Sequence, residues 1–182
     1  MRRQEAIDIL ARHDLERLTP NAREELLRDW WTIDNEDPDY NSLPSRLREE
    51  LARTDEPADA TSLGYDPLLQ LALRRSFVGV INSFLDVRLL RLGYASPHVE
   101  GSVERLEACP CCEHRSLLQR GGYEICKVCF WEDDGMNELD RVSGPNHMTL
   151  RQARQNFERF GAVTDDARSH VLPDGKERYA MK

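Results

Sequence analysis

The chain has 182 residues, of which 40% are hydrophobic and 32% are charged. This composition excludes a disordered acidic tail and a membrane protein, and the length suits one domain of ordinary size or two small ones. The formal net charge of -8 disfavours non-specific binding to a nucleic-acid backbone.

The first ten residues, MRRQEAIDIL, include basic side chains. Neither a long apolar segment nor a small-residue cleavage site follows them, so we expect no secretory signal. The longest charge-free apolar stretch covers residues 76–85, about half of the roughly 20 residues that a bilayer crossing needs. The sequence therefore predicts a cytoplasmic protein without a membrane span.

Helical periodicity dominates residues 1 to about 93. A first helix is expected around residues 7–15, and a second begins at Pro20 after the capping residue Thr19 and ends at Trp30–Trp31. A short amphipathic helix is expected where leucines recur every fourth residue over 43–51. The first hundred residues are therefore predicted to be helical.

One acidic run, Asp34, Glu36, Asp37 and Asp39, interrupts these helices without a basic residue inside it. Such a run is typical of a solvated loop, and the alternative is a contact surface for a basic partner.

The next apolar pattern predicts one long helix from Pro67 to Leu92, which ends at Gly93 and forms the centre of the core. The stretch over 94–102 is short, contains proline and glycine, and has few large apolar residues, which is typical of a domain boundary. We therefore expect a helical domain at 1–100 and a second domain at 101–182, with most of the net negative charge in the first.

All five cysteines lie between Cys109 and Cys129. They include two C-x2-C pairs, Cys109 with Cys112 and Cys126 with Cys129, separated by thirteen residues. Two tight turns of this kind can direct four sulfurs at one point, and the spacing is close to that of zinc ribbons. The sequence predicts one structural zinc ion held by these four cysteines.

Other ligand sets and chemistries fit this spacing less well. Cys111 is the spare thiol, since a set that includes it needs a tighter turn, and His114 or His147 are less suitable substitutes for a thiolate. A redox dithiol at Cys126 and Cys129 would need a strand–loop–helix context that the sequence lacks. Four thiolates close the coordination sphere and leave no place for an activated water, so we expect no enzyme.

The residues around the cysteines predict a hairpin and a helix. Strands are expected over 116–120 and 123–125, with Gly121-Gly122 as the turn, and Phe130 with Trp131 as an apolar cover. A helix should follow from about Leu150 to Gly161, with a capping box of Thr149 and Gln152 at its start and its apolar face on the ribbon. The fold class is thus α+β, mainly α, with a small zinc-ribbon-like module and a packed C-terminal helix.

The motifs CPCC, YEICKVCFWEDDG and GPNHMTLRQARQNFERFG occur in this order between Cys109 and Gly161. This stretch resembles the bacterial cysteine-rich CPCC family. The resemblance implies a zinc-ribbon-like module without established catalysis, and it does not cover residues 1–100. Family members commonly carry glycine after CPCC, whereas Glu113 stands here, so the turn after Cys112 is expected to differ slightly. By analogy, small proteins of this kind are associated with immunity to polymorphic toxins.

An acidic cluster follows the second pair: Glu132, Asp133 and Asp134, with Glu138 and Asp140 nearby. It suggests either a second metal or acid/base site, or carboxylates that are solvated or paired with arginines such as Arg151 and Arg154. We expect the second interpretation, which leaves a hydrolase as the third functional hypothesis.

The first functional hypothesis is a non-enzymatic zinc-binding immunity protein whose partner is a cognate toxin. The alternative is a nucleic-acid-associated zinc-ribbon regulator. It draws on 22 arginines among the 25 basic residues, although the net charge makes a nucleic-acid partner less expected.

Overall fold

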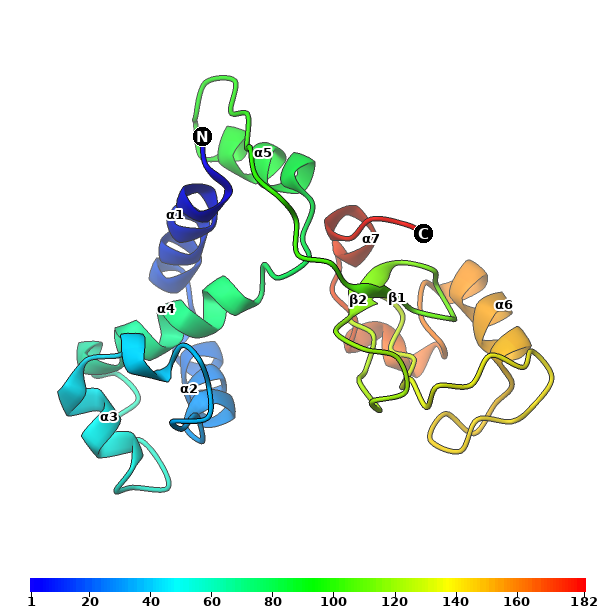
Figure 1. The fold of residues 1–182 in the computed structure, drawn as a ribbon, viewed down its shortest axis with the longest axis horizontal. Helices are drawn as coiled ribbons and strands as arrows, with labels where there is room; N and C mark the ends of the chain where they lie inside the picture. The colour runs from blue at the N-terminus through cyan, green and yellow to red at the C-terminus, as the bar shows by residue number, and fades with distance from the viewer. The chain divides into compact units, whose positions relative to one another are not determined.

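The computed structural model describes residues 1–182 and is mainly helical with one small antiparallel hairpin, which confirms the predicted α+β class (Figure 1). The helices are α1 (Arg3–Glu16), α2 (Pro20–Trp30), α3 (Ser45–Leu51), α4 (Asp66–Arg75), α5 (Asn82–Arg91), α6 (Leu150–Phe160) and α7 (Gly175–Arg178). Short 3-10 helices are η1 (Tyr40–Ser42), η2 (Leu63–Tyr65) and η3 (Asp166–Ser169), and the hairpin is formed by β1 (Glu107–Ala108) and β2 (Arg115–Leu117). None of the helices combines the length and the apolar character needed to cross a bilayer.

The chain divides into two compact units. Unit 1 contains Met1–Val78 and Arg88–Glu100, and unit 2 contains Gly79–Val87 and Gly101–Lys182. Helix α5 therefore contributes residues to both units. The predicted domains, 1–100 and 101–182, stay a prediction, and residues 79–87 are the segment that the structure groups with the C-terminal part.

Unit 1 is built on α4, which contacts α1 and α2 (Figure 1). The Thr19 hydroxyl caps α2 by accepting a hydrogen bond from the Ala22 amide, so the predicted start of this helix is confirmed. Trp31 is buried in the core, where its ring meets Tyr65 edge-on at 5.0 Å and its Nε1 donates to the Thr54 carbonyl. Buried leucines of α2, α3 and α4 complete this core.

The acidic run is partly neutralised within unit 1. The Arg75 guanidinium contacts the carboxylates of both Asp37 and Asp39, at 2.7 and 2.6 Å. Asp34 accepts a hydrogen bond from the Glu36 amide, so its carboxylate stabilises the turn. Half of the run is therefore already paired with a cation, which reduces its capacity to attract a basic partner.

The prediction of one helix from Pro67 to Leu92 is wrong, because the chain leaves the helix after Arg75 and re-enters it at Asn82. Gly79 has a φ of 74°, which a helix does not allow, and its amide donates to a Glu104 carboxylate oxygen. Val80 forms a bridge with Tyr179, and the Ile81 amide donates to the Arg178 carbonyl. The buried apolar residues keep helical spacing across the break, which is why periodicity alone did not reveal it.

The predicted hairpin is also wrong in its pairing. β2 covers Arg115–Leu117 and pairs with β1, which precedes the first cysteine pair. Residues 123–125 pair instead with residues 131–133: the Tyr123 amide donates to the Asp133 carbonyl, and the Asp133 amide donates to the Glu124 carbonyl. In each case, the segment just before a C-x2-C pair thus forms hydrogen bonds with the segment just after the same pair, only a few residues away.

Helix α6 follows its prediction closely. Thr149 and Gln152 form the capping box, and Gly161 ends the helix with a φ of 79°. Leu150 and Ala153 are buried, and Phe157 meets the His114 ring at 6.3 Å. The apolar face of α6 therefore packs against the cysteine-bearing part of unit 2.

Candidate metal centre

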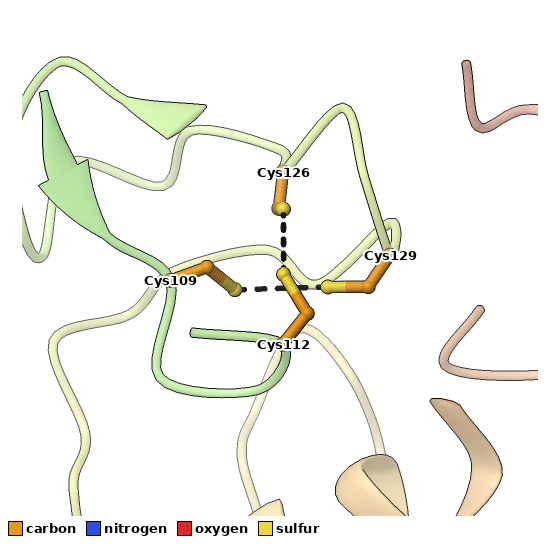
Figure 2. Close-up of side chains that lie close together, drawn as sticks. All are labelled: Cys109, Cys112, Cys126 and Cys129. Atoms are coloured by element: carbon orange, nitrogen blue, oxygen red, sulfur yellow. Dashed lines mark hydrogen bonds between the residues drawn. The ribbon is translucent and has the colours of Figure 1, made fainter. Parts of the chain in front are cut away.

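The first cysteine pair lies in a tight turn between β1 and β2. The Cys109 amide donates to the His114 carbonyl, and the Glu113 amide donates back to the Cys109 carbonyl, both at 2.9 Å. Glu113 has a φ of 64°, in the left-handed region. This reversal closes the turn and leaves the sulfurs of Cys109 and Cys112 on the same side (Figure 2).

The second cysteine pair repeats this backbone arrangement. The Cys126 amide donates to the Trp131 carbonyl, and the Phe130 amide donates to the Cys126 carbonyl, both at 2.8 Å. Phe130, the residue after the second cysteine, has a φ of 70°. The two turns therefore have the same pair of backbone hydrogen bonds at equivalent positions. The residues between the cysteines, Pro-Cys in the first turn and Lys-Val in the second, are unrelated.

The two turns bring all four sulfurs together, each within 4.8 Å of the others (Figure 2). The Cys109–Cys129 and Cys112–Cys126 sulfur separations are both 3.6 Å, so each close pair joins the two turns. A tetrahedral ion with metal–sulfur bonds of about 2.3 Å needs sulfurs roughly 3.8 Å apart, whereas a disulfide needs about 2.05 Å. The arrangement fits a four-thiolate metal site, and all five cysteines are free thiols in the structure.

Burial and crowding set the protonation of the four thiols. Hydrogen bonds from the Cys109, Cys126 and Cys129 thiols lower the pKa of Cys112, whereas burial, reinforced by hydrogen bonding to the neighbouring cysteines, raises the pKa of Cys129. The pKa shifts of these two thiols thus run in opposite directions within one cluster. A divalent ion would stabilise all four thiolates and release the remaining protons, so the affinity for metal should fall as the pH falls.

Several polar groups surround the sulfurs. The Cys126 sulfur lies 3.1 Å from the Ser116 hydroxyl and 3.4 Å from the Val128 amide, which donates to it. The Arg154 guanidinium of α6 donates twice, at 3.0 and 2.7 Å, to the Pro110 carbonyl within the first turn. A zinc ion with four thiolates carries a net charge of two minus, which these donors and this cation would partly offset.

Ser116 and Arg154 were not predicted as neighbours of the site. Arg154 was expected to pair with the acidic cluster, but it hydrogen bonds to the CPCC turn instead. The capping box fixes the start of α6 and so places Arg154 just after the first turn of this helix. Its hydrogen-bond partner depends on how α6 packs against the CPCC turn, which the sequence does not show. Arg151 does pair with a carboxylate of the cluster, that of Asp140, through two hydrogen bonds.

The remaining thiol and the two histidines take other positions. Cys111 is buried but is not in the group of four. His114 is also buried, with Nδ1 2.9 Å from the Cys112 carbonyl oxygen. His147 is exposed in a turn with a φ of 53°.

The acidic residues after Phe130 do not gather into one site. Asp133 is fully buried, and one of its oxygens accepts hydrogen bonds from Arg120 Nε at 2.8 Å and from the Gly121 amide at 2.7 Å. Asp134 accepts from the Ser143 hydroxyl and the Met136 amide. Asp133 and Asp134 thus act as fixed acceptors for loops.

The apolar cover divides in a similar way. Trp131 is fully buried, whereas Phe130 is partly exposed and contacts the His170 ring, with ring centres 5.3 Å apart and ring planes tilted by 32°.

Comparison with known proteins supports the resemblance seen in the sequence. Residues 107–177 match the Cysteine-rich CPCC family. The match begins at β1 and ends in α7, and therefore includes both cysteine turns and α6. No curated protein and no solved structure matches the chain. We call residues 107–177 the CPCC region.

The left-handed conformation of Glu113 gives a prediction for the CPCC region. A residue with a side chain costs roughly 1–2 kcal/mol in this conformation, and glycine does not have this penalty. We expect Glu113→Gly to raise the free energy of unfolding of the metal-loaded protein by about 1 kcal/mol in urea titrations. Glu107→Gly, at an exposed strand position without positive φ, is the matched control and should lower it. A loss of stability in both variants would contradict the prediction.

Proposed function

We propose that the protein is a non-enzymatic zinc-binding protein in which Cys109, Cys112, Cys126 and Cys129 hold one structural Zn²⁺ ion. The observation that carries this proposal is the set of four buried sulfurs within 4.8 Å of one another, held by two equivalent turns. Thiolate sulfur is the donor that structural zinc sites prefer.

The donor set also supports a structural role for the metal. Four thiolates fill a tetrahedral sphere, so a bound zinc would have no position for water or substrate. The CPCC region contains one hairpin with strands of two and three residues, which is a thin core for a stable module. Zinc would supply the stability that this core lacks, since structural sites contribute roughly 10–16 kcal/mol of apparent binding energy.

The function that we propose for the whole chain is protein binding: an immunity protein that occludes a cognate bacterial toxin in the cytoplasm. The association of CPCC-bearing proteins with toxin immunity supports it by analogy. The net charge of -8 supports it physically, because an acidic inhibitor gains association rate and complementarity against basic toxins that act on nucleic acids.

The alternative function, a nucleic-acid-associated regulator, has less support. Many arginines that could contact phosphates form ion pairs with carboxylates of the same chain, among them Arg23, Arg74, Arg75, Arg88, Arg120, Arg151 and Arg178. Each such pair removes a free cation from the surface.

Affinity capture from native cells tests the proposed function. The tagged full-length protein is purified with nuclease treatment and a high-salt wash, and the bound material is identified by mass spectrometry. We expect one stoichiometric protein that is toxic when expressed alone and harmless when co-expressed with this chain. Recovery of nucleic acid before nuclease treatment and of nothing after it would overturn the immunity function in favour of the regulator. Binding to nucleic acid that falls steeply with salt would support the same conclusion.

A further inference from the structure

We propose that a pocket in unit 2 binds the side chain of an arginine or lysine that a protein partner presents. The pocket has a volume of about 290 Å³ and is lined by residues from three segments: residues 125–132, which include the second cysteine pair, residues 145–148, and residues 163–170. It adjoins the metal centre without including it: Phe130 directly follows Cys129, and the Val163 amide donates to the Cys129 carbonyl at 2.8 Å.

Hydrogen bonds from two asparagine side chains to the backbone fix the walls of this pocket. The Asn146 side chain accepts from the Glu132 amide at 2.9 Å and donates to the Glu132 carbonyl at 2.8 Å. The Asn156 side chain of α6 donates to the Val163 carbonyl at 2.7 Å. A pocket held in this way loses little conformational freedom when a ligand enters, which favours binding.

The lining combines apolar surface with two unpaired carboxylates. Ile125, Phe130, Met148 and Val163 supply the apolar part, and Glu132 and Asp166 supply the charges. Neither carboxylate forms an ion pair in the structure, whereas Asp133, Asp140, Asp165 and Asp174 of the same unit each pair with an arginine. The pocket therefore carries negative charge that no cation of the chain neutralises by direct contact.

Arginine and lysine match both parts of this lining. Each has a stem of methylene groups that can lie on apolar surface and a cationic head that can reach a carboxylate. A neutral aliphatic side chain would leave the carboxylates unpaired, and an acidic one would be repelled. Partial burial of a cation between an aromatic ring and two carboxylates is also typical of an interface anchor. The inference rests on the proposed protein-binding function and gives that function a contact site in the CPCC region.

Short peptides test this pocket in the zinc-loaded, full-length protein. The probes are acetyl-Gly-Arg-Gly-amide and the same peptide with norleucine in place of arginine, titrated while backbone amide signals are followed by NMR. We expect the arginine peptide to shift the signals of residues 125–132, 145–148 and 163–170 in a saturable way, and the norleucine peptide to bind at least tenfold more weakly. Equal binding of the two peptides, or shifts outside these segments, would overturn the proposal.

A pair of matched double variants separates this site from general charge attraction. Glu132→Gln with Asp166→Asn should weaken the arginine peptide at least tenfold. Glu138→Gln with Glu158→Gln changes the net charge equally at exposed positions that do not line the pocket, and should leave the binding unchanged. Equal weakening in both double variants would overturn the proposal. The proposal would also be overturned if the same signals shifted as the protein concentration is raised without peptide. Such shifts would show that a second copy of the chain occupies the pocket.

The same variants distinguish this inference from the proposed function. If capture identifies a protein partner and Glu132→Gln with Asp166→Asn binds it as tightly as the unaltered chain, the pocket is not the contact site and the inference fails alone. If capture identifies no protein but the arginine peptide binds at the pocket as expected, the cation site stands and the immunity function fails.

Discussion

Replacing Cys112 by serine should abolish zinc binding and unfold the CPCC region, with an expected loss of roughly 10 kcal/mol or more of metal-linked folding energy. The serine hydroxyl is a poor ligand at neutral pH, and Cys112 lies 3.6 Å from its close partner Cys126 in the cluster. The same result is expected for serine at Cys109, Cys126 or Cys129. The zinc content measured by elemental analysis should fall from one ion per chain to none. The amide NMR signals of residues 107–177 should move into the narrow chemical-shift range of an unfolded chain.

Cys111→Ser is the matched control because it alters a neighbouring buried thiol outside the group of four. It should keep one zinc ion per chain and lose only the stability of a small buried side chain, about 1 kcal/mol. Full zinc content in Cys112→Ser together with loss of zinc in Cys111→Ser would show that a different ligand set operates. Absence of zinc from the unaltered protein would contradict the site itself.

Asp133→Ala should destabilise the CPCC region by roughly 1–3 kcal/mol, because it removes a fully buried acceptor that holds two partly exposed donors. The lost carboxylate oxygen is the shared acceptor of the Arg120 guanidinium and the Gly121 amide. Chemical denaturation of the zinc-loaded protein, followed by the NMR signals of the same region, measures the effect. The loops before and after this residue would lose their common anchor.

Two variants control for this effect. Asp133→Asn keeps an oxygen that accepts both hydrogen bonds, so its cost should be clearly smaller than that of alanine. Glu138→Ala, at an exposed position of the same acidic cluster, should change the free energy of unfolding by less than about 0.5 kcal/mol. A normally stable Asp133→Ala protein would contradict the structural role of this aspartate.

The sequence predicted those features that depend on local signals. The start of α2 at Pro20, the capping box of α6 and its end at Gly161 each follow from side chains within one turn of the helix terminus. The grouping of the four cysteine sulfurs was predictable for the same reason, because C-x2-C spacing constrains a single tight turn. The glycine that family members commonly carry after CPCC is replaced here by Glu113, and this residue has a left-handed backbone in the structure.

The features that the sequence did not predict depend on partners far along the chain. Gly79 was assigned to a helix interior, but its amide bonds to Glu104 and the next two residues pair with Tyr179 and Arg178. Residues 123–125 have strand-like composition, but they pair with residues 131–133. The turn that begins at Cys126 brings these two segments together, and the buried Asp133 side chain anchors the second of them. The pocket at Phe130 and His170 joins segments from three parts of the sequence and has no local signature.

The two equivalent cysteine turns also determine how the centre can assemble. Each turn is closed by hydrogen bonds between residues at most five positions apart, so each is a half-site that can form early and independently. Because each turn carries two of the four cysteines, an ion first captured by one half-site would have only two of its four ligands. Capture of the second half-site then closes the intervening loop, so metal uptake is expected to proceed in two steps, with the ion acting as the last cross-link.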